Sequence, residues 1–409
     1  FSRWSPWQSC CAAWGCKSHP RIHTRGFGMQ HPVIEQRPVA TARAQQAMQT
    51  NDHQRESAVQ TVLRLIVGCL MLACGVLLAQ RLPNPDLFGD YVAVCRWWQR
   101  FPTQSWVAAI SRCDPLVDYR AFGPNPHPPF STLLLLPLGL FAWPDARWVW
   151  FGISGCCLLG AWHFHRVPVV VCAATALFGV FGLYRGTLEP FLFALMLVAL
   201  TVEKTRPIHA ASLIGLAAAI KIYPGLLLAS FLLERRYRAF LTGVAAASAA
   251  TMISTMATGL DVLGEWVTHT APNAHFWRSN PDNLSLARIV GNIAPQFSPL
   301  LAAIFFFALT LLLLARKKGF PVSMQTLLPA TLLATPLVWS HYIIHTGLLR
   351  LTRLEQVLFL AGGSLIFLSS LNLLPIQNAA VAYGPVLAAL VLLWYRAWRD
   401  GLHLPTEPV

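Results

Sequence analysis

The stretch IHAASLIGLAAAIKIYPGLLLASFLL, residues 208–233, decides the fold class of this chain. It exceeds the roughly 20 apolar residues with which a helix crosses about 30 Å of hydrocarbon. Similar runs recur along the whole chain, at residues 58–80, 129–143, 147–164, 167–183, 188–202, 239–258, 297–315, 323–339, 355–370 and 378–398. The pattern predicts an all-α polytopic membrane protein with about ten to twelve transmembrane helices.

The same stretch also predicts a break. Basic residues precede it (Lys204 and Arg206) and follow it (residues 235–238), and basic loops mark the cytoplasmic side. Both ends therefore lie inside. Pro224 supports a turn in the middle, because a proline inside a helix loses a hydrogen bond and clashes with the preceding turn. We expect two half-length helices that turn on the outer side near residues 221–224.

The composition excludes an ordinary soluble domain. Of 409 residues, 55% are hydrophobic and 12% are charged, against about 25% charged in soluble domains. The net charge of +14 does not indicate nucleic acid, because the basic residues form short clusters at the ends of apolar runs. Those clusters, at residues 234–238, 316–318 and 396–399, fit cytoplasmic loops beside anionic lipid headgroups.

Residues 1–47 differ from the rest, because they are polar and have no apolar core of their own. We expect them to be disordered or a mis-called start, and residues 48–409 to form a single transmembrane domain. Cys10, Cys11 and Cys16 offer three zinc ligands without a convincing fourth. The two longer polar loops, residues 81–127 and 260–296, are expected outside the membrane.

The number of apolar segments before Arg185 does not agree with the side of the membrane on which the basic residues place it. Three crossings between residues 129 and 184 would put Arg185 inside, whereas Lys204 and Arg206 require it to lie outside. One of the three segments therefore does not cross, and the sequence does not say which. In the first outer loop, Cys95 and Cys113 are candidates for a disulfide.

Lys221 is the first candidate for a functional residue. An ionisable group at membrane depth costs at least about 2.5–3.5 kcal/mol, so a lysine in an apolar run needs a reason. It could hold a phosphate as a point charge. The alternative is that it snorkels to the interface.

The outer side collects the remaining unusual polar residues. Asp86 and Asp90 lie four apart, on one face of an expected helix over about residues 86–101. Two such carboxylates suit a general base or a metal pair, and the alternative is a helix cap in a solvated loop. His341 is a ligand, a proton relay or an interfacial bystander. The other candidates on this side are Arg185, Glu189, Asn283, Ser285 and Arg288.

Several short motifs, in order, resemble glycosyltransferase family 87, a family of polyprenol-phosphate-mannose-dependent mannosyltransferases with the GT-C membrane fold. The resemblance runs from about residue 65 to residue 396. Its motifs are PDLFGDY (residues 85–91), NPHPPF (125–130) with LPL (136–138), GLAAAIKIYP (215–224), NLSL (283–286) and WSH (339–341). The chain departs from the family where it has His127 in place of Tyr, and GTLE (186–189) in place of Gly-Gln-x-Asn.

The resemblance implies an inverting transfer of a sugar from a polyprenyl-phosphate donor to an acceptor hydroxyl. Asp86 would be the base, and Asp90 would be the runner-up base or would orient the acceptor. The donor phosphate would be held by Lys221, with Arg185 and His341. Neither a metal nor another cofactor is required. The family implies mannose, although a pentose-phosphate lipid would present the same phosphate. The expected partners are the bilayer, the lipid-linked sugar and a glycan or glycolipid acceptor, with the site on the periplasmic or outer face of the plasma membrane.

Two other classes of function stay open. A secondary transporter also has broken helices and a midplane lysine, but it would carry inverted repeats, and none is visible in the sequence. A lipid-binding membrane protein without catalysis would tolerate the loss of Asp86, whereas the enzyme would not.

Overall fold

The computed structural model describes residues 38–81, 85–100, 110–114, 116–119, 127–270, 283–286, 288–289, 298–316, 323–335, 337–371, 373–374 and 379–400. It divides the chain into two compact units, Phe1–Arg55 and Glu56–Val409. The boundary predicted at residue 48 lies inside the first helix, α1 (Pro38–Arg81). The possible zinc ligands Cys10, Cys11 and Cys16 lie outside the described residues.

The described residues are helical and contain no strand, so the all-α prediction is confirmed. After α1 the elements follow in this order: α2 (Pro85–Trp98), α4 (Pro129–Leu135), η2 (Leu136–Leu140), α5 (Trp143–Phe164), α6 (Val169–Arg185), α7 (Glu189–Val202), α8 (Pro207–Ile220), η3 (Tyr223–Leu228), α9 (Ala229–Leu233), α10 (Tyr237–Thr258), α11 (Leu260–Glu265), η4 (Trp266–Thr270), α14 (Pro299–Arg316), α15 (Met324–Ala334), η6 (Ser340–Leu348), α16 (Arg353–Ser370) and α17 (Ala379–Asp400).

Each apolar run singled out in the sequence corresponds to one or more of these elements. Two stretches of the described residues, Ala58–Arg81 and Tyr237–Thr258, are long and apolar enough to cross a membrane by length and composition. Several of the others are shorter apolar helices, such as Val169–Arg185. The break in residues 208–233 is confirmed, because α8 ends at Ile220 and the chain restarts as η3 at Tyr223.

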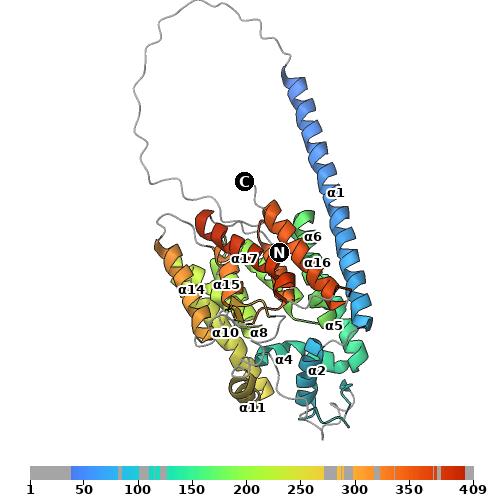
Figure 1. The fold of residues 1–409 in the computed structure, drawn as a ribbon, viewed down its shortest axis with the longest axis vertical. Coiled ribbons are helices and arrows are strands. Elements are labelled where there is room, and N and C mark those ends of the chain that lie inside the picture. The colour runs from blue at the N-terminus through green and yellow to red at the C-terminus, as the bar shows by residue number, and fades with distance from the viewer. Residues whose placement is uncertain are drawn as a thin grey trace, which may run out of the picture. The chain divides into compact units, whose positions relative to one another are not determined.

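Two elements lie at the centre of the second unit. Helix α7 packs against α5, α8 and η6, and η6 packs against α6, α7 and α15. All residues of η6 from His341 to Leu348 are buried. Runs of 3₁₀ helix longer than three or four residues are uncommon and often mark functional segments. Around this centre, α16 packs beside α17, and α10 packs beside α8 (Figure 1).

Glycine makes the crossing of α8 and α10 close. A side chain at Gly215 would collide with the backbone carbonyl of Gly243. Small residues at helix crossings let backbones approach, as is typical of packing in membranes. This close approach helps to hold the end of α8, at Ile220, in position.

Helix α2 is held at its C-terminal end by two contacts. Cys95 and Cys113 form a disulfide, as the sequence suggested. Near the end of α2, Arg100 pairs with Asp261 in α11 and donates to the carbonyl of Thr258. The helix predicted over residues 86–101 therefore exists, and its contacts fix it against neighbouring elements.

Candidate active site

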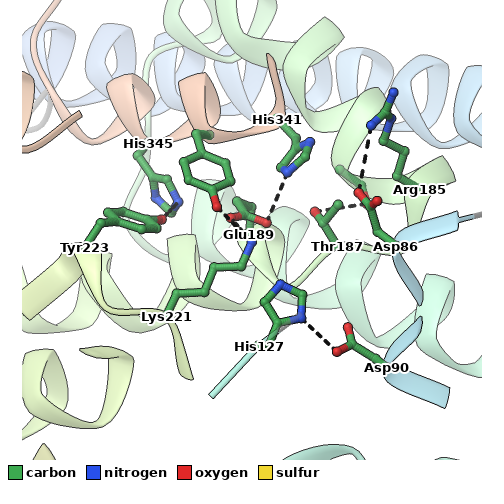
Figure 2. A network of polar contacts seen from close by, with 12 residues as sticks. Asp86, Asp90, His127, Arg185, Thr187, Glu189, Lys221, Tyr223, His341 and His345 are labelled. Atoms are coloured by element: carbon green, nitrogen blue, oxygen red, sulfur yellow. Dashed lines mark hydrogen bonds and ion pairs between the residues drawn. The ribbon is translucent and has the colours of Figure 1, made fainter. Parts of the chain in front are cut away.

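Polar side chains from five separate places in the sequence meet in one network (Figure 2). They come from α2, the residues before α4, the turn between α6 and α7, the break after α8, and η6. The members are Asp86, Asp90, His127, Arg185, Thr187, Glu189, Lys221, Tyr223, His341, Tyr342 and His345. Five of the predicted site residues, namely Asp86, Arg185, Glu189, Lys221 and His341, lie within electrostatic range of one another.

A left-handed glycine positions the turn between α6 and α7. Gly186 has φ +69°, which favours glycine because other residues are strained there. A Cβ at this position would also lie 2.5 Å from Cβ of Leu87 in α2. Helix α6 thus ends at Arg185, α7 begins at Glu189, and the turn packs directly on the helix that carries Asp86 and Asp90.

The break after α8 places Lys221 in the network. Its backbone is extended (φ −142°, ψ 135°), so the side chain leaves the helical direction. Nζ lies 2.6 Å from Oε1 of Glu189 and 3.3 Å from the hydroxyl of Tyr342, and 4.6 Å from the centre of the Tyr342 ring. The Lys221 side chain is only 8% exposed, so the snorkelling interpretation is wrong.

Glu189 is the most enclosed charge in the network, with a side chain that is 0% exposed. Its Oε1 accepts the hydrogen bond from Lys221, while its Oε2 lies 3.7 Å from Nε2 of His341 and has no hydrogen-bond partner. Nδ1 of His341 also lacks a partner. Buried polar atoms are nearly always hydrogen-bonded, so these atoms mark a place where a ligand or water belongs.

Two stacked tyrosines, Tyr223 and Tyr342, pack beside Lys221. The Tyr223 ring stacks on the Tyr342 ring with centroids 5.1 Å apart, and its hydroxyl lies 2.6 Å from Nε2 of His345. Neither composition nor spacing singles out Tyr223, Tyr342 or His345 as site residues. Tyr223 was nevertheless part of the quoted GLAAAIKIYP motif, and His345 follows His341 by four residues.

The two aspartates of α2 have different surroundings. Asp90 is buried, and its Oδ1 lies 2.7 Å from Nδ1 of His127. Asp86 is 32% exposed, and its Oδ2 lies 4.0 Å from Nη1 of Arg185. Partial loss of water raises the pKa of Asp86, while the positive charge of Arg185 opposes that rise. Asp86 is therefore the more accessible base. Asp90 instead contacts His127, which stands where the family often has Tyr.

The predicted residues of the second loop form a separate group. Oδ1 of Asn283 accepts hydrogen bonds from the backbone N–H groups of Ser285 and Val338, and Nη1 of Arg288 donates to the Asn283 carbonyl. The Ser285 hydroxyl accepts from the Arg288 N–H. These contacts hold the loop against Val338, three residues before His341, so the group positions the start of η6.

One family model matches the chain. The model of glycosyltransferase family 87 matches residues 126–340, more than half of the chain. The chain belongs to glycosyltransferase family 87. The match includes Arg185, Glu189 and Lys221 and ends one residue before His341, whereas Asp86 and Asp90 precede it. No curated protein and no solved structure matches the chain.

Family 87 membership makes the protein a glycosyltransferase, and the resemblance noted in the sequence is confirmed. Within the described residues, no group of three or more His, Cys, Asp or Glu side chains could hold a metal ion.

Proposed function

We propose that this family 87 glycosyltransferase moves a sugar from a polyprenyl phosphate to an acceptor hydroxyl on the outer face of the plasma membrane. The observation that carries the proposal is the pairing of an accessible carboxylate, Asp86, with the cations Arg185 and Lys221 within electrostatic range. A base and a phosphate-binding group are the two parts that such a transfer requires.

The proposed step inverts the anomeric carbon. Asp86 takes the proton of the acceptor hydroxyl as that oxygen bonds to C1 of the sugar. The bond between C1 and the phosphate oxygen breaks, and its electron pair stays on the lipid phosphate. Arg185, which is partly exposed, and Lys221, which is buried, stabilise that developing charge. His341 adds a further donor, mannose is the sugar that we propose, and a glycan or glycolipid is the acceptor.

Ionic contacts support an outer location for the site, because they join residues predicted to lie on the same side of the membrane. Residues expected outside contact one another, as Arg96 does with Glu265. Residues expected inside do likewise: the guanidinium of Arg236 donates to the Glu203 carbonyl, and Arg396 pairs with Glu355. Two layers of ionic contacts at opposite helix ends are what a polytopic membrane bundle would show.

The segment Pro129–Leu140 is the one that we propose does not cross. The residues on either side of it contact the same helix, α2, because His127 contacts Asp90 and the Tyr91 hydroxyl donates to the Phe141 carbonyl. Helices α4 and η2 together are also far shorter than the roughly 20 residues of a crossing. With this segment re-entrant, α5 and α6 cross in opposite directions and Arg185 falls outside, as the charges at Lys204 and Arg206 require.

The test is transfer of labelled mannose from polyprenyl-phosphate mannose in membranes that contain wild type or Asp86→Asn at equal levels. We expect transfer by wild type and a loss of at least 100-fold in the variant, roughly the share that general-base catalysis contributes. Equal transfer by both proteins would remove Asp86 from the mechanism and bring Asp90→Asn into the same assay. Uptake of a sugar without transfer would instead support a transporter.

A further inference from the structure

Glu189 is a carboxylate placed among the cations that would bind a phosphate. It is fully buried, lies 2.6 Å from Nζ of Lys221 through Oε1, and leaves Oε2 without a hydrogen bond. Oε2 lies 3.7 Å from Nε2 of His341, so Glu189 faces two of the groups that we propose bind the phosphate. Its charge therefore acts on whatever anion approaches Lys221.

The charges of the site do not favour a strongly negative ligand. The two cations, Lys221 and Arg185, stand against three carboxylates, Asp86, Asp90 and Glu189. The histidines that face Lys221 from η6 and from the start of α4 are His341, His345 and His127. Counted over the lysine, the arginine and the three carboxylates, the group has one more negative than positive charge. Lys221 also has only one N–H left, because Glu189 and Tyr342 occupy the other two.

The donor and the lipid product differ in charge. A polyprenyl-phosphate sugar is a phosphodiester with one negative charge. The lipid phosphate that remains after transfer is a monoester, whose second ionisation near pH 6 gives it almost two charges at neutral pH. Once the proton captured by Asp86 leaves for solvent, the site holds one more negative charge than before.

We infer that Glu189 makes the site prefer the singly charged phosphodiester over the doubly charged phosphomonoester, and so promotes release of the lipid product. The inference rests on the proposed function, because it takes a polyprenyl-phosphate sugar as the donor. Glu189 acts through Lys221 and is a positioning residue. At an effective dielectric constant near 20, an extra unit charge about 12 Å from the carboxylate costs about 1.4 kcal/mol, which corresponds to a preference of about tenfold, and a closer approach gives more.

The test measures binding to the purified full chain in lipid nanodiscs, without turnover. The probes are farnesyl phosphate, a monoester, and methyl farnesyl phosphate, a diester with the same chain. Dissociation constants are measured at about pH 5 and about pH 7.5, on either side of the second ionisation of the monoester. The diester serves as a reference, because its own charge is constant, so titration of the protein affects both probes while ionisation of the probe affects only one.

Wild type is expected to bind the diester about tenfold more tightly than the monoester at pH 7.5, and both about equally at pH 5. Glu189→Gln keeps the shape and an acceptor for Lys221 but removes the charge, so it is expected to lose the preference. Glu203→Gln is the matched control, because it removes a buried carboxylate from the opposite end of the same helix, α7, and should keep the preference.

The outcomes separate this inference from the proposed function. Binding of both probes by wild type with no preference at pH 7.5 overturns the inference and leaves the lipid-phosphate donor standing. A preference that persists in Glu189→Gln overturns the role of Glu189. Failure of wild type to bind either probe overturns the inference and the proposed donor together. If Glu189→Gln does not fold, wild type alone still tests the inference: a preference for the diester that is as large at pH 5 as at pH 7.5 overturns it, because the second charge of the monoester is then not its cause.

Discussion

Lys221→Met should destabilise the protein through the charge that it leaves behind. The substitution keeps an apolar side chain near the Tyr342 ring but removes the ammonium 2.6 Å from Oε1 of Glu189. Glu189 is 0% exposed, so water cannot replace the lost partner. Breaking a buried ion pair by removing one partner costs about 3–5 kcal/mol, and we expect the free energy of unfolding to fall by that amount.

Removing the second charge should restore most of the loss. In the double variant Lys221→Met with Glu189→Gln, neither group is charged, and uncharged replacements of buried pairs are often neutral. We expect its free energy of unfolding to return to within about 1–2 kcal/mol of wild type. Binding of the phosphodiester probe should remain weak in both variants, because both lack the lysine that we propose holds the phosphate.

The assay is denaturant titration of the three proteins in detergent micelles, with probe binding measured on the same preparations. The double variant controls for folding, because it separates loss of stability from loss of the phosphate ligand. A single variant as stable as wild type would show that Lys221 and Glu189 do not depend on each other. A double variant that regains stability and also binds the probe like wild type would remove Lys221 from the phosphate site.

Three further predictions concern the scaffold. Burial raises the pKa of Glu203 from 4.5 to about 7. The stability that its protonated form contributes is therefore present at low pH and is lost as pH rises from 4.5 to about 7. Unfolding titrations should show the free energy of unfolding of wild type falling by roughly 3 kcal/mol across this window, and that of Glu203→Gln falling far less. Gly215→Ala should lower the free energy of unfolding by about 1–3 kcal/mol through overpacking against α10. Gly152→Ala is the control, because its new methyl group meets open space in α5, and it should raise the free energy of unfolding by up to about 1 kcal/mol. Equal effects of the two substitutions in denaturant titrations would contradict the close crossing of α8 and α10. Cys95→Ser should cost about 3 kcal/mol by opening the 18-residue separation to Cys113, and reductant should have the same effect on wild type and none on the variant.

The helices could be predicted from the sequence because their signal is local. Apolar runs bounded by basic clusters predicted most elements. The charges around residues 208–233, together with Pro224, predicted the break after α8. The sequence did not predict η6 as an element, since nine residues between Ser340 and Leu348 are too few for a crossing by the usual length rule. Only the packing of α6, α7 and α15 around it explains why this short segment is buried.

Several individual residues of the site could be predicted from the sequence, but the contacts between them could not. Lys221 stood out as a lone charge in an apolar run, and Glu189 stood out as a departure from a family motif, yet nothing in a spacing of 32 residues indicates that they touch. The same holds for Asp90 and His127, which are 37 residues apart. Pairings of this kind depend on how the turn at Gly186 and the break after α8 place their helices, and these are tertiary features.

The disulfide between Cys95 and Cys113 has a consequence for where the protein can mature. Cys95 lies in α2, the helix that carries Asp86 and Asp90, so the bond ties the two carboxylates to the adjoining outer segment. Disulfides form and persist in oxidising compartments and are rare in the cytosol. On the proposed topology, the helix with the catalytic base therefore receives its last covalent constraint only after export. A chain retained in the cytosol would carry every residue of the site and still lack the tie that fixes the base.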